Sequence, residues 1–170
     1  MAEDPAVLPA LLFTADMFPG SGSLNGRRWA AQQLLRSWIA LAGNRPIPFG
    51  SFNPPELEGM VPLLQTYGHC GAVQPIGLLH PEALGSVGGL FLPDPQIGRW
   101  AAWRQAAGDA HFSLIGQIHT LSTRAAMGLL DSLVVQPVQP WDALICSSHA
   151  GRQVVEHLLH DRQEQLQRRL

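Results

Sequence analysis

The chain has 170 residues, of which 46% are hydrophobic and 14% are charged, and its formal net charge is -2. This length suggests a single domain over residues 1–170, the composition excludes a disordered chain, and the charge gives no reason to expect a nucleic-acid partner. All eleven basic residues are arginine, which excludes both a Schiff-base lysine and a phosphate-loop lysine.

Short apolar segments alternate with amphipathic segments along the chain. The expected strands are Pro9–Thr14, Pro46–Phe49, Ala72–Leu79, Val87–Leu92, Phe112–His119 and Ala143–Ser147. They lack regular polar alternation, which is typical of strands buried on both faces of a parallel sheet. The expected helices are Arg27–Ala42, one starting at Asn53–Glu56, Gln96–Ala107, Ser122–Leu133, and one from Ser148 to the end. This order predicts an α/β fold, a three-layer Rossmann-like lobe with a mainly parallel sheet.

The third of these helix patterns, at Gln96–Ala107, has both aromatic and basic residues. Trp100 and Trp103 are three residues apart and are expected in the core. Arg99 and Arg104 are expected to be solvated.

A glycine-rich loop follows the first expected strand. Gly20, Gly22 and Gly26 are spaced one residue more widely than the dinucleotide fingerprint, and Gly50 and Ser51 stand where its acidic residue belongs. NAD binding is therefore disfavoured. A loop in this place presents backbone N–H groups and a helix N-terminus to an anion. We favour a phosphate-bearing ligand here over a flexible turn without a ligand.

Two further residues are expected at the carboxyl edge of the sheet. Asp16 follows the first strand, and two roles stay open for it: accepting a bond from a substrate hydroxyl, or starting a turn. His119 ends an apolar strand, where α/β folds place their ligands. It is either a ligand-binding residue or a strand-end histidine bonded to a nearby carbonyl.

The remaining chemistry-bearing residues give weak signals. The seven histidines do not form a metal-binding motif, and no Gly-x-Ser-x-Gly elbow is present, so we expect no metal, no cofactor and no α/β-type serine hydrolase. Cys146 lies within an expected strand and is predicted to be part of the core.

The sequence also bears on location. The beginning of the chain is acidic where a signal peptide is basic, and no apolar run reaches membrane-spanning length. Two cysteines are too few for a disulfide framework and suit a reducing compartment. We expect a cytoplasmic protein with no membrane span.

Several segments together resemble the N-terminal lobe of a glycosyltransferase with the two-lobed GT-B fold, of the retaining glycogen-synthase and sucrose-synthase-like group. They are the opening strand with Phe18–Ser23, the segment Ile115–Thr120 with the histidine that the family has in this lobe, and Trp141–Ser148, which is similar to a strand leading into the helix toward the second lobe. The alternating order and the length also match one lobe.

The resemblance implies roles for particular residues. His119 would be the catalytic residue beside the transferred sugar, and the substrate-binding residues would be Asp16, Gly20, Ser21, Gly22 and Asn25. The partners would be a nucleotide sugar, an acceptor, and a C-terminal donor lobe that these 170 residues do not include. Because most nucleotide contacts belong to that lobe, we expect the chain alone to be inactive. The alternative function is a non-catalytic, doubly wound module that binds a phosphorylated small molecule or a protein.

Overall fold

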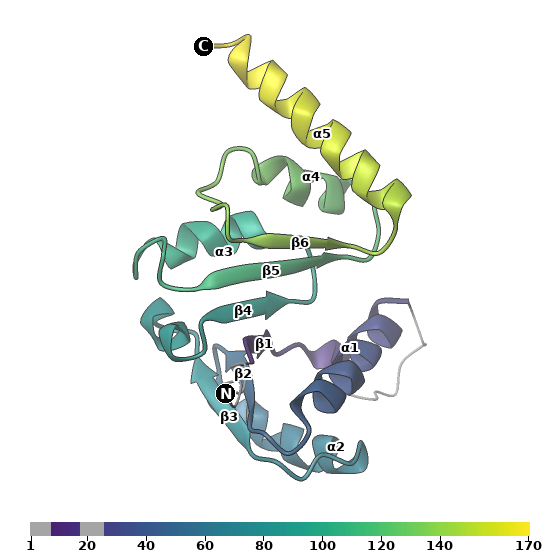
Figure 1. Cartoon of the computed structure of the whole chain (residues 1–170), viewed down its shortest axis with the longest axis vertical. Coiled ribbons are helices and arrows are strands. Elements are labelled where there is room, and N and C mark those ends of the chain that lie inside the picture. Colours follow the sequence, from purple (N-terminus) through teal and green to yellow (C-terminus); the bar gives the residue numbers. More distant parts are fainter. Residues whose placement is uncertain (1–7, 18–25) are drawn as a thin grey trace, which may run out of the picture. The chain divides into compact units, whose positions relative to one another are not determined.

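The computed structural model describes residues 8–17 and 26–170 (Figure 1). The chain divides into two compact units, Met1–Phe91 and Leu92–Leu170. Every strand pair that the structure describes is parallel, and helices connect the strands, so the chain has the Rossmann-like α/β fold that the sequence predicts. That residues 1–170 form one domain stays a prediction.

The first unit is a parallel arrangement of strands in the order β3-β2-β1-β4. Its elements are β1 (Ala10–Leu12), the 3-10 helix η1 (Ala15–Met17), α1 (Gly26–Ala42), β2 (Ile47–Ser51), η2 (Pro54–Gly59), α2 (Met60–Thr66), β3 (Val73–Gly77), η3 (Pro81–Ser86) and β4 (Gly89–Leu92), which ends at the unit boundary. The chain moves from β1 outward to β3 and then returns to the other side of β1. The order therefore reverses beside β1, and open α/β sheets bind ligands at the carboxyl side of such a reversal.

The central strands of this unit are buried on both faces, as their unbroken apolar sequence predicts. All residues of β2 and β4 are buried. Gly50 lies in a tightly packed part of β2, where a Cβ would lie 3.1 Å from Leu78 Cδ1 and 3.2 Å from Leu90 Cδ1, so a larger residue would have to displace these side chains. At the edge of the unit, β3 exposes Pro75, a residue that sheets tolerate mainly in edge strands.

Helix α1 packs through one apolar face. Leu35, Trp38 and Ala42 are buried, and the Trp38 ring meets Phe91 edge-on at 5.0 Å between centroids. The helix ends at Gly43, whose φ of +59° is a conformation that favours glycine. The Gly43 carbonyl accepts a hydrogen bond of 3.0 Å from Nδ1 of the buried His69. This bond connects the C-terminal end of α1 to the segment between α2 and β3.

The second unit contains two paired strands and three helices among its described elements. These are α3 (Ile97–Arg104), β5 (Ser113–Ile118), α4 (Arg124–Ser132), β6 (Ala143–Cys146) and α5 (His149–Gln167). Strands β5 and β6 are parallel, with Gly116 opposite Leu144 and Ile118 opposite Cys146, so both end on the same side (Figure 1). Helices α4 and α5 contribute Leu130 and Val155 to a buried cluster with Ile118 of β5.

Polar side chains mark where the last two helices begin. Thr123 Oγ1 accepts a hydrogen bond of 3.1 Å from the Ala126 N–H at the start of α4. Ser148 Oγ accepts one of 3.0 Å from the Gly151 N–H at the start of α5, where the sequence predicts a helix to begin. The helix start expected at Asn53 differs, because a 3-10 helix begins at Pro54 and the Asn53 side chain caps no N–H.

A buried ion pair joins three parts of the second unit. Nη1 and Nη2 of Arg104, at the end of α3, donate to the two carboxylate oxygens of Asp142 at 2.6 and 2.9 Å. Arg104 Nη1 also donates to the Phe112 carbonyl, and Asp142 accepts from the Leu114 and Gln139 N–H groups. The prediction that Arg104 is solvated is therefore wrong: its side chain is 0% exposed.

We predict that Asp142→Asn lowers the free energy of unfolding by about 3–5 kcal/mol, because it leaves the Arg104 guanidinium buried without a compensating charge. Urea denaturation followed by circular dichroism measures the loss. The control is Asp161→Asn at an exposed position of α5, which should change stability by no more than about 0.5 kcal/mol. Equal midpoints for the two variants would contradict the structural role of the pair.

Candidate functional site

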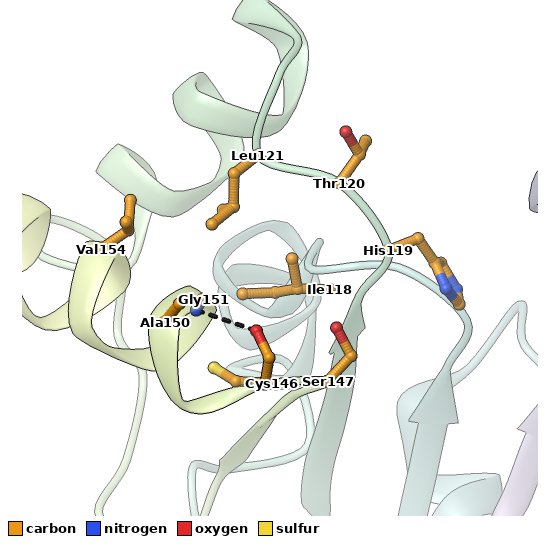
Figure 2. A pocket seen from close by; sticks show the side chains of 10 residues that line it. Ile118, His119, Thr120, Leu121, Cys146, Ser147, Ala150, Gly151 and Val154 are labelled. Atoms are coloured by element: carbon orange, nitrogen blue, oxygen red, sulfur yellow. Dashed lines mark hydrogen bonds between the residues drawn. The ribbon is translucent and has the colours of Figure 1, made fainter.

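The second unit has a cavity at the carboxyl ends of β5 and β6. It measures about 310 Å³, and Figure 2 shows its walls. The loop after β5 supplies His119, Thr120 and Leu121, while β6 and the start of α5 supply the opposite side. The full lining is Ile118, His119, Thr120, Leu121, Cys146, Ser147, Ser148, Ala150, Gly151 and Val154. The parallel pairing of the two strands is what brings these loops together.

His119 lies at the rim of this cavity and is held by a hydrogen bond. Its Nε2 is 2.7 Å from the carbonyl oxygen of Pro93, an atom that can only accept, so Nε2 is the donor. The ring points away from Ile118 and Leu121 in Figure 2. This bond is the one expected of a strand-end histidine bonded to a nearby carbonyl. The other ring nitrogen, Nδ1, takes no part in it and is the atom left for a ligand.

Ser147 lines the same cavity as His119. The two residues directly follow Cys146 and Ile118, which lie opposite each other in the β5–β6 register. Their shared position is thus a direct consequence of strand pairing.

The other predicted site residues belong to the first unit. Asp16 lies in η1, and its carboxylate oxygen Oδ1 is 3.7 Å from Nε of Arg28 in the first turn of α1. This ion pair ties the segment after β1 to the following helix. Gly20, Ser21, Gly22 and Asn25 fall outside the described residues, so their role in ligand binding stays a prediction.

Cys146 is half-buried: it packs against the buried cluster of Ile118, Leu130 and Val155 and also lines the cavity, so the prediction of a core residue is right only in part. Burial raises the pKa of its thiol; the nearby Arg152 guanidinium acts to lower that pKa, and the Glu156 carboxylate acts to raise it. With burial the largest effect, the thiol stays protonated near neutral pH and is a poor nucleophile.

A second cavity of about 390 Å³ adjoins the first at the α5 N-terminus and shares Cys146, Ser147 and Ser148 with it. Arg152 lines this cavity together with His149 and Ser148. Arg152 Nε also lies 3.2 Å from Glu156 Oε1, one helical turn on. The guanidinium is therefore placed at the second cavity and not in the wall of the first.

Three residues that line the first cavity are not singled out by any sequence pattern. They are Leu121 in the β5–α4 loop and Ala150 and Gly151 in α5. Whether these residues line the cavity depends on the orientation of α5 relative to β6, and this orientation cannot be predicted from local sequence patterns. The run of small residues Ala150–Gly151 after Ser148 is the one feature compatible with an open space beside the helix start.

No group of three or more His, Cys, Asp or Glu side chains is arranged to hold a metal ion within residues 8–17 and 26–170. In the same ranges, none of the helices combines the length and the apolar character needed to cross a bilayer. Comparison with family models, curated proteins and solved structures finds no match to this chain.

We predict that iodoacetamide at pH 7.5 alkylates the exposed Cys70 before Cys146, because partial burial and a raised pKa both protect the Cys146 thiol. Peptide mapping by mass spectrometry gives the two rates. Arg152→Gln should slow alkylation of Cys146, since it removes the charge that lowers the pKa, whereas Glu156→Gln should speed it. If the rate of Cys146 alkylation changed in the same direction in both variants, the opposite effects of Arg152 and Glu156 on the Cys146 pKa would be contradicted.

Proposed function

We propose that this chain is the N-terminal, acceptor-side lobe of a cytoplasmic glycosyltransferase with the GT-B fold, which transfers a sugar from a nucleotide-sugar donor to an acceptor. The observation that carries the proposal is the placement of His119 and Ser147 at one cavity at the carboxyl ends of β5 and β6. The resemblance to the retaining group puts His119 beside the transferred sugar, and it makes Ser147 the end of the strand that leads into the helix toward the second lobe. The Rossmann-like α/β fold of the chain agrees with such a lobe.

The chemistry divides between two lobes in this proposal. A retaining transfer needs positive charge to stabilise the departing diphosphate, and this chain has no lysine. Those groups would come from the donor lobe. The present lobe would bind the acceptor, and the backbone N–H groups of the loop with Gly20 and Gly22 would lie near the donor phosphates.

His119 has a defined role in this proposal. The bond from Nε2 to the Pro93 carbonyl holds the ring and leaves Nδ1 as an acceptor for a sugar hydroxyl. A bond to a hydroxyl of the transferred sugar that shortens as charge develops would favour the transition state over the ground state.

A non-catalytic binding module is the second candidate. The bond between His119 and Pro93 favours it, because a structural histidine would make that same bond. The two candidates differ in whether nucleotide sugars turn over when a donor lobe is present.

We predict that purified residues 1–170 bind nucleotide sugars weakly and show no transfer or hydrolysis above background. Mass spectrometry of product formed from a panel of nucleotide sugars measures this. Enzymes commonly turn over at about 1–1,000 s⁻¹. Turnover in that range by this chain would overturn the assignment to half of a two-lobed enzyme.

We predict that His119→Ala lowers kcat roughly tenfold to a hundredfold in a protein that joins this chain to its donor lobe, since a bond worth about 1.5–3 kcal/mol is lost in the transition state. Stability should fall by only about 1 kcal/mol, the worth of the Pro93 bond. Denaturation midpoints and single-turnover rates separate the two effects.

The control for this experiment is His119→Gln. Its amide N–H₂ can replace the Nε2 donor toward Pro93, so stability should return while the rate stays low. A His119→Ala protein that loses stability but keeps its full rate would assign His119 to the structure alone and favour the binding module.

A further inference from the structure

The cavity at the carboxyl ends of β5 and β6 has a distinctive chemical lining. Ile118, Leu121 and Val154 form the apolar part of the lining, and Figure 2 shows Val154 on the helix α5 and Leu121 on the loop after β5. Hydroxyl groups come from Thr120, Ser147 and Ser148.

Charged side chains are absent from this wall. Among the described residues that line the cavity, none is Asp, Glu or Arg. The first guanidinium along α5, that of Arg152, lines the adjoining second cavity, which shares Cys146, Ser147 and Ser148 with the first, and it pairs with Glu156. The Cys146 thiol adds no charge, because burial raises its pKa. A phosphate or carboxylate placed here meets no guanidinium among the described lining residues, and the Arg152 guanidinium, whose charge acts on Cys146, is already paired with Glu156.

The hydroxyl groups are arranged to serve a neutral polar ligand. Ser148 Oγ already accepts from the Gly151 N–H, which leaves its O–H proton to donate elsewhere. Thr120 Oγ1 accepts from the Ser122 N–H at 3.2 Å and is 2.8 Å from Ser122 Oγ, so one of its three hydrogen-bonding positions is left for a ligand. Such groups both donate and accept, as alcohols do.

Gly151 keeps the wall open on the α5 side. A Cβ at this position would lie 3.2 Å from Ser148 Oγ and 4.0 Å from Leu121 Cδ1, between the polar and the apolar parts of the lining. Because Gly151 has no side chain, the space between Ser148 and Leu121 stays open.

We propose that this cavity binds an uncharged alcohol with an apolar portion, such as a neutral alkyl glycoside, and does not accept a phosphorylated or acidic ligand. The proposal rests on the proposed function to the extent that the alcohol is the acceptor of the sugar. Hydroxyls of the ligand bond Thr120, Ser147 and Ser148, and its apolar part contacts Leu121 and Val154.

The test is titration of the full chain with n-hexyl β-D-glucopyranoside, followed by NMR of the backbone amides. The amides of Thr120, Ser147 and Gly151 should shift together and saturate. Glucose, which lacks the apolar part, and hexyl phosphate, which carries charge, should each bind at least about fivefold more weakly.

Two matched pairs of variants locate the binding. Val154→Glu places a carboxylate in the apolar wall at an exposed helix position and should weaken binding roughly tenfold, whereas Gln153→Glu adds the same charge one residue away and should not. Gly151→Ala narrows the cavity and should weaken binding. Gly128→Ala in α4, where a Cβ meets nothing within 4 Å, is its control.

The proposal is overturned if hexyl phosphate binds as tightly as the glucoside, if no saturable binding occurs, or if both members of a pair behave alike. None of these measurements requires sugar transfer. A failure here would therefore change the class of ligand and leave the glycosyltransferase proposal to its own kinetic tests.

Discussion

The ion pair between Arg104 and Asp142 is the interaction on which the second unit depends. Both side chains are almost fully buried, at 0% and 1% exposed. A buried guanidinium needs a counter-charge and acceptors for its N–H groups; the Asp142 carboxylate and the Phe112 carbonyl supply these to Nη1 and Nη2, while Nε is buried without a partner. One contact thus holds the end of α3, the start of β5 and the chain entering β6.

The same contact bears on the register of β5 against β6. Asp142, directly before β6, accepts a hydrogen bond of 2.8 Å from the N–H of Leu114, the second residue of β5. With the strands aligned at this end, Ile118 lies opposite Cys146 at the other, and His119 and Ser147 follow together. A shift of one residue would turn every side chain of β6 to the opposite face and would separate the residues of the cavity.

The cavity combines this register with the geometry of a helix start. Ser148 caps the N-terminus of α5, directly after the connection from β6. The small residue Gly151 in the first turn of α5 leaves space beside the helix. The charge of Arg152 lies at the adjoining second cavity, where Arg152 pairs with Glu156. The position of the cavity thus follows from parallel pairing, and its neutral character follows from which face of α5 each side chain occupies.

Much of the fold could be predicted because the relevant signals are local. The expected segments Phe112–His119 and Ala143–Ser147 contain β5 and β6, and the helix expected to begin near Ser148 does so. Runs of apolar residues between turns, and a serine before a helix, act through neighbouring backbone groups. The helix start predicted at Asn53 is only partly right. A helix does begin after Asn53, but Pro54–Gly59 form a 3-10 helix and the Asn53 side chain does not cap it.

The sequence by itself determined the strands and helices, their α/β order and the residues at the carboxyl ends of the strands, because each depends on the spacing of residues near one another. Only the tertiary structure decided that Arg104 is buried, since its partner lies 38 residues away and reaches it through the packing of α3 against β5. It also decided that Cys146 lines a cavity with Leu121 and Val154. Contacts of this kind arise when strand pairing brings distant loops together, and hydrophobic periodicity contains no information about which loops will meet.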